Sequence, residues 1–93
     1  MLSSALKHRM SKMVLEFYKI QSEFSDIRCF NVIQYDFVFD FIVVSCSLVS
    51  GAIQYDLFQI KRNSDNSMSF VNFIRTFDTE QRANIVFVAL TKI

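Results

Sequence analysis

The period of the apolar residues changes once along this chain, close to residue 25. Before this point, large apolar residues recur at intervals of three and four, which places them on one face of a helix. These residues are Leu2, Leu6, Met10, Met13, Val14, Phe17 and Phe24. The opposite face carries Lys12 and Glu16, whose opposite charges four residues apart favour a helix. The pattern therefore predicts one amphipathic helix over residues 3–23.

After residue 26 the chain is rich in Val, Ile, Phe and Tyr, whose branched or bulky side chains suit a pleated sheet. Runs of alternating side chains there are separated by polar connections. Ser50 and Gly51 form the only tight-turn dipeptide that contains a glycine, and they predict a hairpin in which Gly51 has a positive φ or forms a bulge. Strands are expected within residues 28–49, 52–62, 68–77 and 84–93.

The predicted fold class is α+β, with an N-terminal amphipathic helix packed on a four- or five-stranded antiparallel meander. A chain of 93 residues, 52% of them hydrophobic, is long enough for one core and too short for two, so residues 1–93 are expected to form a single domain. Apolar side chains occupy both faces of residues 37–44, and one helix covers only one face. The other face is therefore expected to meet another protein chain, a lipid or a second copy of the chain.

A small single-pass membrane protein is the alternative interpretation. Residues 41–55 contain no charged side chain, and about 20 mainly apolar residues suffice to cross a bilayer as a helix. In this alternative, residues 37–57 span the membrane and a helix over residues 2–24 lies at its interface. Asp40 and Asp56, the Ser-Gly dipeptide and the many β-branched residues favour the α+β domain instead.

The residues that usually carry enzyme chemistry are scarce in this sequence. His8 is the only histidine, and Cys29 and Cys46 lack the spacing of a zinc or redox site, so we expect free thiols, with a bridge between them as the alternative. A single glycine excludes the known phosphate-binding loops, and the acidic residues are dispersed. The sequence therefore predicts a protein without catalytic residues, cofactor or metal.

The charge pattern and the N-terminus suggest a partner class and a location. A net charge of +1 without a cluster of basic residues argues against nucleic acid as a partner. The N-terminus lacks the continuous apolar run of a classical signal peptide. We therefore expect an intracellular, cytoplasmic protein, with a membrane or mitochondrial location as the alternative.

The residues around the predicted hairpin resemble those of a known family. Residues 47–51, Ser-Leu-Val-Ser-Gly, are similar to the Gln-x-Val-x-Gly hairpin of the cystatins, with Val49 and Gly51 at the matching positions. A helix followed by an antiparallel meander is also similar to the cystatin fold. The resemblance implies reversible inhibition of papain-like cysteine proteases by two hairpins that form a wedge. The contact residues it implies are Leu48, Val49, Ser50, Gly51, Phe77, Asp78 and Thr79.

Overall fold

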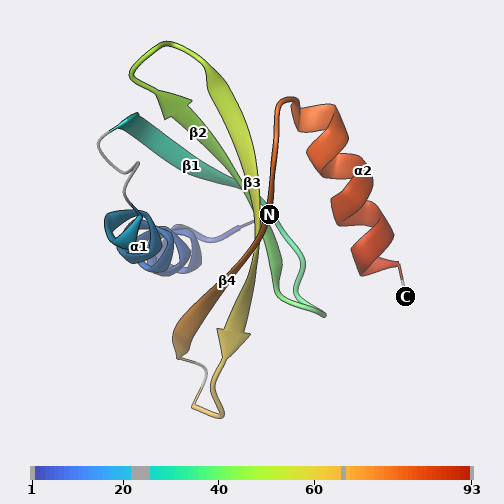
Figure 1. Cartoon of the computed structure of the whole chain (residues 1–93). Helices are drawn as coiled ribbons and strands as arrows, with labels where there is room; N and C mark the ends of the chain where they lie inside the picture. Colours follow the sequence, from blue (N-terminus) through green and yellow to red (C-terminus); the bar gives the residue numbers. More distant parts are fainter. Residues whose placement is uncertain (1, 22–25, 66, 93) are drawn as a thin grey trace.

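Figure 1 shows the computed structural model, which describes residues 2–21, 26–65 and 67–92. The elements are, in order, α1 (Ser4–Ile20), β1 (Ile27–Tyr35), β2 (Phe41–Leu48), β3 (Ile53–Arg62), β4 (Met68–Phe77) and α2 (Glu80–Thr91). The four strands form one antiparallel sheet in the order β1-β2-β3-β4. Helix α1 covers one face of the sheet and α2 covers the opposite face. The predicted α+β class, with its N-terminal helix on an antiparallel meander, is confirmed.

Helix α1 begins where the sequence predicts. Ser3 caps it, because its hydroxyl oxygen accepts a hydrogen bond from the Leu6 amide at 3.1 Å. Met10, Val14 and Tyr18 are buried, and their spacing of four residues aligns them on the face that meets the sheet. The helix ends at Ile20, and the last part of the predicted range, residues 22–23, lies outside the described residues.

The predicted hairpin connects β2 and β3 through a loop of Val49, Ser50 and Gly51. The Gly51 amide donates to the Leu48 carbonyl at 2.9 Å, and the Leu48 amide donates to the Ala52 carbonyl at 2.8 Å. Gly51 has a φ of +94°, a conformation that glycine adopts without steric cost. A three-residue loop that ends in a left-handed glycine is a common hairpin connection, so the expectation for Gly51 is confirmed.

The chain reverses between β1 and β2 through residues 36–40, which contain neither glycine nor proline. A hydrogen bond and an ion pair stabilise this turn instead. The Asp36 carboxylate accepts from the Phe39 amide at 2.6 Å, and Asp40, with a φ of +62°, forms an ion pair with Arg62 at 2.8 Å. Aspartate tolerates the left-handed region better than most side chains, which explains its place here.

The strand expected over residues 84–93 is wrong, because α2 occupies this part of the chain. The Thr79 side chain accepts from the Arg82 amide at 3.2 Å and caps the helix, and Glu80 follows in the first turn. Ala83 and Phe87, four residues apart, are buried against the sheet. The β-branched residues here favour a strand only weakly, and this burial outweighs their intrinsic preference.

Helix α2 also changes two other expectations. Val43 of β2 is fully buried under α2, so the sheet face that was expected to meet a partner is covered by the chain itself. The spanning helix proposed over residues 37–57 is wrong, because these residues form the turn after β1, strand β2, the hairpin loop and the start of β3. In the described parts of the chain, neither helix combines the length and the apolar character that crossing a bilayer requires.

The core between α1 and the sheet generates a stability prediction. Phe58 of β3 is fully buried, with its ring centroid 5.3 Å from that of Phe17 and 5.5 Å from that of Phe73. Phe58→Ala is expected to lower the free energy of unfolding by about 3–5 kcal/mol, because it removes buried apolar area and leaves a cavity.

Phe37 provides the matched control for this prediction. Phe37 lies in the turn after β1 and is 56% exposed. Phe37→Ala is therefore expected to lower the free energy of unfolding by less than about 1 kcal/mol. Urea unfolding measures both variants. Similar losses for the two would show that Phe58 does not belong to the core described.

Candidate functional site

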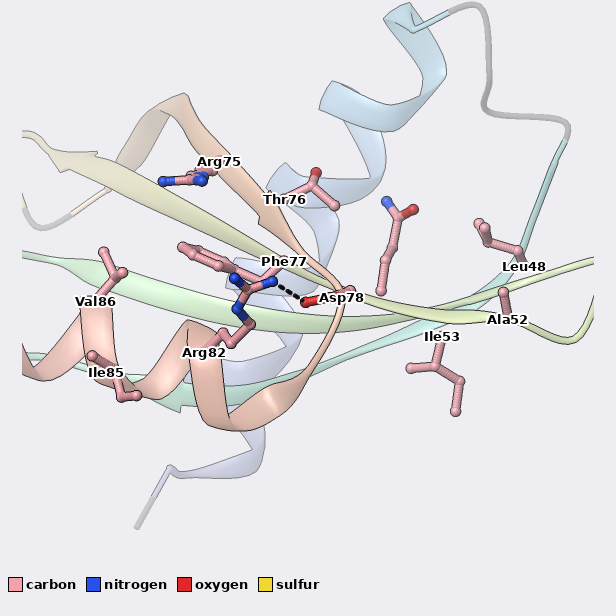
Figure 2. Close-up of a pocket in the computed structure, with 11 residues that line it drawn as sticks. Leu48, Ala52, Ile53, Arg75, Thr76, Phe77, Asp78, Arg82, Ile85 and Val86 are labelled. Atoms are coloured by element: carbon pink, nitrogen blue, oxygen red, sulfur yellow. Dashed lines mark hydrogen bonds and ion pairs between the residues drawn. The ribbon is translucent and has the colours of Figure 1, made fainter.

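One end of the sheet carries a groove that several separate segments form together. The β2–β3 loop and the connection from β4 to α2 both lie at this end (Figure 1). We name the space between them the hairpin-end groove; its volume is about 630 Å³. Its lining residues, drawn in Figure 2, are Leu48, Ala52, Ile53, Gln54, Arg75, Thr76, Phe77, Asp78, Arg82, Ile85 and Val86.

Strands β3 and β4 have ten residues each, but two register shifts offset their ends, and this offset creates the groove. The last residue pair between the two strands is Tyr55 with Phe77, so β3 extends beyond β4 by the two residues Ile53 and Gln54. After Phe77 the chain turns away into α2. The floor of the groove is therefore sheet, and its walls are the hairpin on one side and the first half of α2 on the other.

Exposed aliphatic side chains gather around this groove. Val49 in the hairpin loop is 69% exposed, Ile53 at the start of β3 is 51% exposed, and Ile85 on α2 is 61% exposed. Single apolar residues on a surface are common and need no explanation, but a group of them around one concavity is typical of a binding surface. This end of the molecule is therefore the strongest candidate for a contact surface.

Two arginines give the groove its charge. Arg82 forms an exposed ion pair with Asp78 at 3.2 Å, and its guanidinium lowers the pKa of the Asp78 carboxyl below its usual value. The Arg75 guanidinium lies 5.3 Å from the centroid of the Phe77 ring. Within the described residues, Arg75 forms no ion pair with an acidic side chain. The groove therefore holds two positive charges and one negative charge.

The structure brings most of the contact residues implied by the cystatin resemblance to this end. Val49, Ser50 and Gly51 are exposed on the hairpin loop, beside Leu48. Asp78 and Thr79 are exposed in the β4–α2 connection.

Two parts of that prediction need correction. Phe77 is only 7% exposed, because it packs under α2 with Ala83 and Phe87, so it belongs to the core. The second hairpin expected at residues 77–79 is absent, since a connection from strand to helix occupies this position.

Sequence reasoning missed Ile53, Arg75 and Ile85, which complete the groove. These residues line one groove only because α2 forms, whereas the sequence predicted a strand over residues 84–93. The available signal was Thr79 followed by Glu80, a combination typical of a helix N-terminus. With α2 recognised, the apolar residues of the last segment would have been assigned to a helix that crosses the sheet.

A cluster of hydrogen-bonded polar side chains lies in the core between α1 and the sheet. Asp56 of β3 is 1% exposed. Its carboxylate accepts hydrogen bonds from the Tyr18 hydroxyl at 2.5 Å, from the Thr76 hydroxyl at 2.7 Å and from the side-chain amide of Gln54 at 3.2 Å. Burial and the neighbouring Asp56 carboxylate raise the pKa of Tyr18. Both carboxylate oxygens have donors, so this group links α1 to β3 and β4 and serves the structure.

The side chains that commonly bind metal ions are dispersed in the described structure. Within residues 2–21, 26–65 and 67–92, no three side chains of His, Cys, Asp or Glu are grouped as metal ligands. Both cysteines are free, with Cys29 exposed and Cys46 buried. Burial raises the pKa of the Cys46 thiol to about 11, which disfavours the reactive thiolate.

No family model, curated protein or solved structure matches this chain. The resemblance to the cystatins therefore rests on the hairpin residues and the order of the first elements alone.

The buried hydroxyl and thiol groups predict a loss of stability in alkali. Burial raises the pKa of Tyr35 to about 12 and that of Cys46 to about 11, from 10.0 and 9.0, and it also raises the pKa of Tyr18. Raised values in the folded state mean that the unfolded chain loses these protons first. The urea midpoint is therefore expected to be nearly constant from about pH 6 to about pH 8 and to fall as the pH rises from about 9 to about 12.

Tyr18→Phe tests the contribution of the group around Asp56. The variant removes a donor from a buried carboxylate and is expected to cost about 1–3 kcal/mol at neutral pH. It should also reduce the decline in alkali. The control is Tyr55→Phe, because the Tyr55 hydroxyl has no hydrogen bond to the described residues, and a cost below about 0.5 kcal/mol is expected. Equal costs would contradict the role assigned to Tyr18.

Proposed function

We propose that this chain is a non-catalytic protein-binding module that contacts its partner at the hairpin end of the sheet. The observation that carries the proposal is the exposure of Ile53 and Ile85, which line the groove, and of Val49 in the hairpin loop next to it, each by more than half. Burial of these side chains against a partner would release water from apolar surface and favour association. The arginines at the groove would supply the polar contacts that orient the partner.

The hairpin loop is held in one conformation before any partner arrives. Two backbone hydrogen bonds join Leu48 to Gly51 and to Ala52. In addition, the Val49 amide donates to the Asp26 carbonyl at 2.8 Å. A loop fixed in this way loses little conformational entropy when it binds, which favours affinity. The preorganisation of the loop therefore supports a role in recognition.

Selection from a phage-displayed random peptide library tests the proposal. The triple variant Val49→Ser, Ile53→Ser, Ile85→Ser removes the exposed aliphatic groups at little cost to the fold, because all three are largely exposed. Peptides enriched on the natural chain are expected to bind this variant at least about tenfold more weakly, as loss of apolar anchors usually produces.

The control variant carries Ile20→Ser and Val38→Ser, which remove two exposed aliphatic side chains away from the groove. It is expected to bind the selected peptides as the natural chain does. Enrichment that survives the triple variant, or no enrichment at all, would contradict binding at the hairpin end.

Reversible inhibition of papain-like cysteine proteases is a second proposed function, favoured by the exposed hairpin loop with Val49 and Gly51 at the cystatin positions. A hairpin of this kind would fill the active-site cleft through backbone and apolar contacts. The β4–α2 connection, with Asp78 and Thr79 exposed beside it, would take the place of the second hairpin of the family.

Papain provides the direct test of inhibition. Gly51→Val is expected to weaken inhibition at least about tenfold, because a positive φ is strained for a β-branched residue. A Cβ at this position would meet no neighbour within 4 Å, so the loss would come from the backbone conformation. Gly51→Asn is the matched control, since asparagine tolerates positive φ better, and it should retain more inhibition. Absence of inhibition by the folded natural chain would remove this second function.

A further inference from the structure

A cavity lies on the α1 face of the sheet, beside the end of α1, and we name it the helix-side cavity. The last turn of α1 and side chains from all four strands line it, and its volume is about 380 Å³. Small-molecule sites in proteins have volumes of roughly 300–1,000 Å³. The size of the helix-side cavity therefore fits a small organic molecule.

Aromatic and aliphatic side chains form much of the wall of this cavity. Phe17 of α1 and Phe73 of β4 stack, with their ring centroids 5.7 Å apart. Ile27 of β1 and Leu48 of β2, which are paired in the sheet, add aliphatic surface. Phe73 is 40% exposed, so part of this apolar surface is open to a ligand. Burial of an apolar group against these side chains would favour its binding.

The charged side chains that line the helix-side cavity are acidic. They are Asp26 and Asp56, and no lysine or arginine is among the described residues of the lining. Lys19 and Arg28, which flank Asp26 in the sequence, are exposed and lie outside the lining. In the described parts of the chain, neither carboxylate forms an ion pair. Negative charge without a cationic partner favours a cation as ligand, and the aromatic rings beside it favour a cation further.

The hydrogen bonds of Asp56 show how a ligand would reach this buried carboxylate. The hydroxyls of Tyr18 and Thr76 donate to separate oxygens at 2.5 and 2.7 Å. The side-chain amide of Gln54, which lines the cavity, donates to both oxygens at the longer distances of 3.2 and 3.3 Å. A charged donor forms a stronger hydrogen bond than a neutral amide does. An ammonium group would therefore replace Gln54 at Asp56, while Tyr18 and Thr76 keep their bonds.

We infer that the helix-side cavity binds a small organic amine, in its protonated form, that carries an apolar body. The ammonium group would donate to Asp56, with Asp26 adding to the attraction, and the apolar body would pack against Phe17, Phe73 and Leu48. This inference goes beyond the proposed role in protein binding and does not depend on it. Helix α2, which lines the hairpin-end groove, contributes no residue to the described lining of this cavity.

Three matched probes test the inference by NMR titration of the isotope-labelled chain. Phenylbutylamine, phenylbutanol and phenylbutyrate share an apolar body and carry a cation, a neutral hydroxyl and an anion. The amine is expected to bind at least about tenfold more tightly than the alcohol, because a charged donor strengthens a hydrogen bond to a buried carboxylate. The anion is expected to bind most weakly. General electrostatic attraction does not produce this order, since the net charge of the chain is +1.

The titration also locates the ligand. The backbone signals of Ile27, Leu48 and Thr76 are expected to shift when the amine binds, because these residues line the cavity. The signals of Ala83 and Phe87, which are buried on the other face of the sheet, are expected to stay unchanged. Shifts confined to α2 and its face of the sheet would contradict binding in the helix-side cavity.

Asp56→Asn identifies the group that selects the amine. The variant keeps the shape of the side chain and is expected to bind the amine and the alcohol alike. Asp26→Asn, at an exposed position, is expected to reduce the preference for the amine about twofold to fourfold, and it tests the charge even if Asp56→Asn does not fold. Glu80→Gln, on α2 and outside the cavity, is the matched control and should keep the full preference. Urea unfolding confirms that each variant is folded.

Three outcomes would overturn the inference: no measurable binding of the amine at millimolar concentration, equal binding of the amine and the alcohol by the natural chain, or a preference for the amine that is unchanged in the folded aspartate variants. The proposed function is separable from these results. The peptide selection reports on Val49, Ile53 and Ile85, none of which lines the helix-side cavity, so the two proposals can succeed or fail independently.

Discussion

The hydrogen bonds around the buried carboxylate of Asp56 hold the first helix to the sheet. An ionised group without partners in an apolar core is strongly destabilising, so Asp56 requires the donors of Tyr18, Gln54 and Thr76. These donors come from α1, β3 and β4, so the carboxylate links the helix to two strands. The surrounding apolar side chains provide most of the driving force for folding, while this polar group adds a directional requirement.

The candidate surface depends on the second helix rather than the first. Helix α2 buries Val43 and Leu57 and closes the face of the sheet that α1 leaves open. To reach that face the chain leaves β4 at Phe77, so Ile53 and Gln54 of β3 lie beyond the last residue pair of the two strands. The groove, with Arg82 and Ile85 of α2 in its lining, follows from this departure. A single topological step thus completes the core and creates the surface to which we assign binding.

The local signals of the sequence were sufficient for most of the framework. The helical spacing of Met10, Val14 and Phe17 and the turn at Gly51 identified α1 and the hairpin, because each signal concerns residues close in the chain. The last segment failed because isoleucine and valine fit a strand or a buried helix equally well over a short range. Of the candidate site, the exposed loop was predictable from its glycine. Arg75 and Ile85 were not, because they meet the loop only through the tertiary fold.

The sequence by itself determined the α+β class, the first helix and the bounds of β3 and β4, since periodicity and turn residues act within a few positions. The tertiary structure alone decided that the residues after Thr79 form a helix, that Phe77 is buried and that both faces of the sheet are covered. It also decided which residues of distant segments share the groove. The physical reason is that burial is a property of pairs of surfaces. An apolar stretch becomes a strand, a helix or an interface according to the surface that remains open to it.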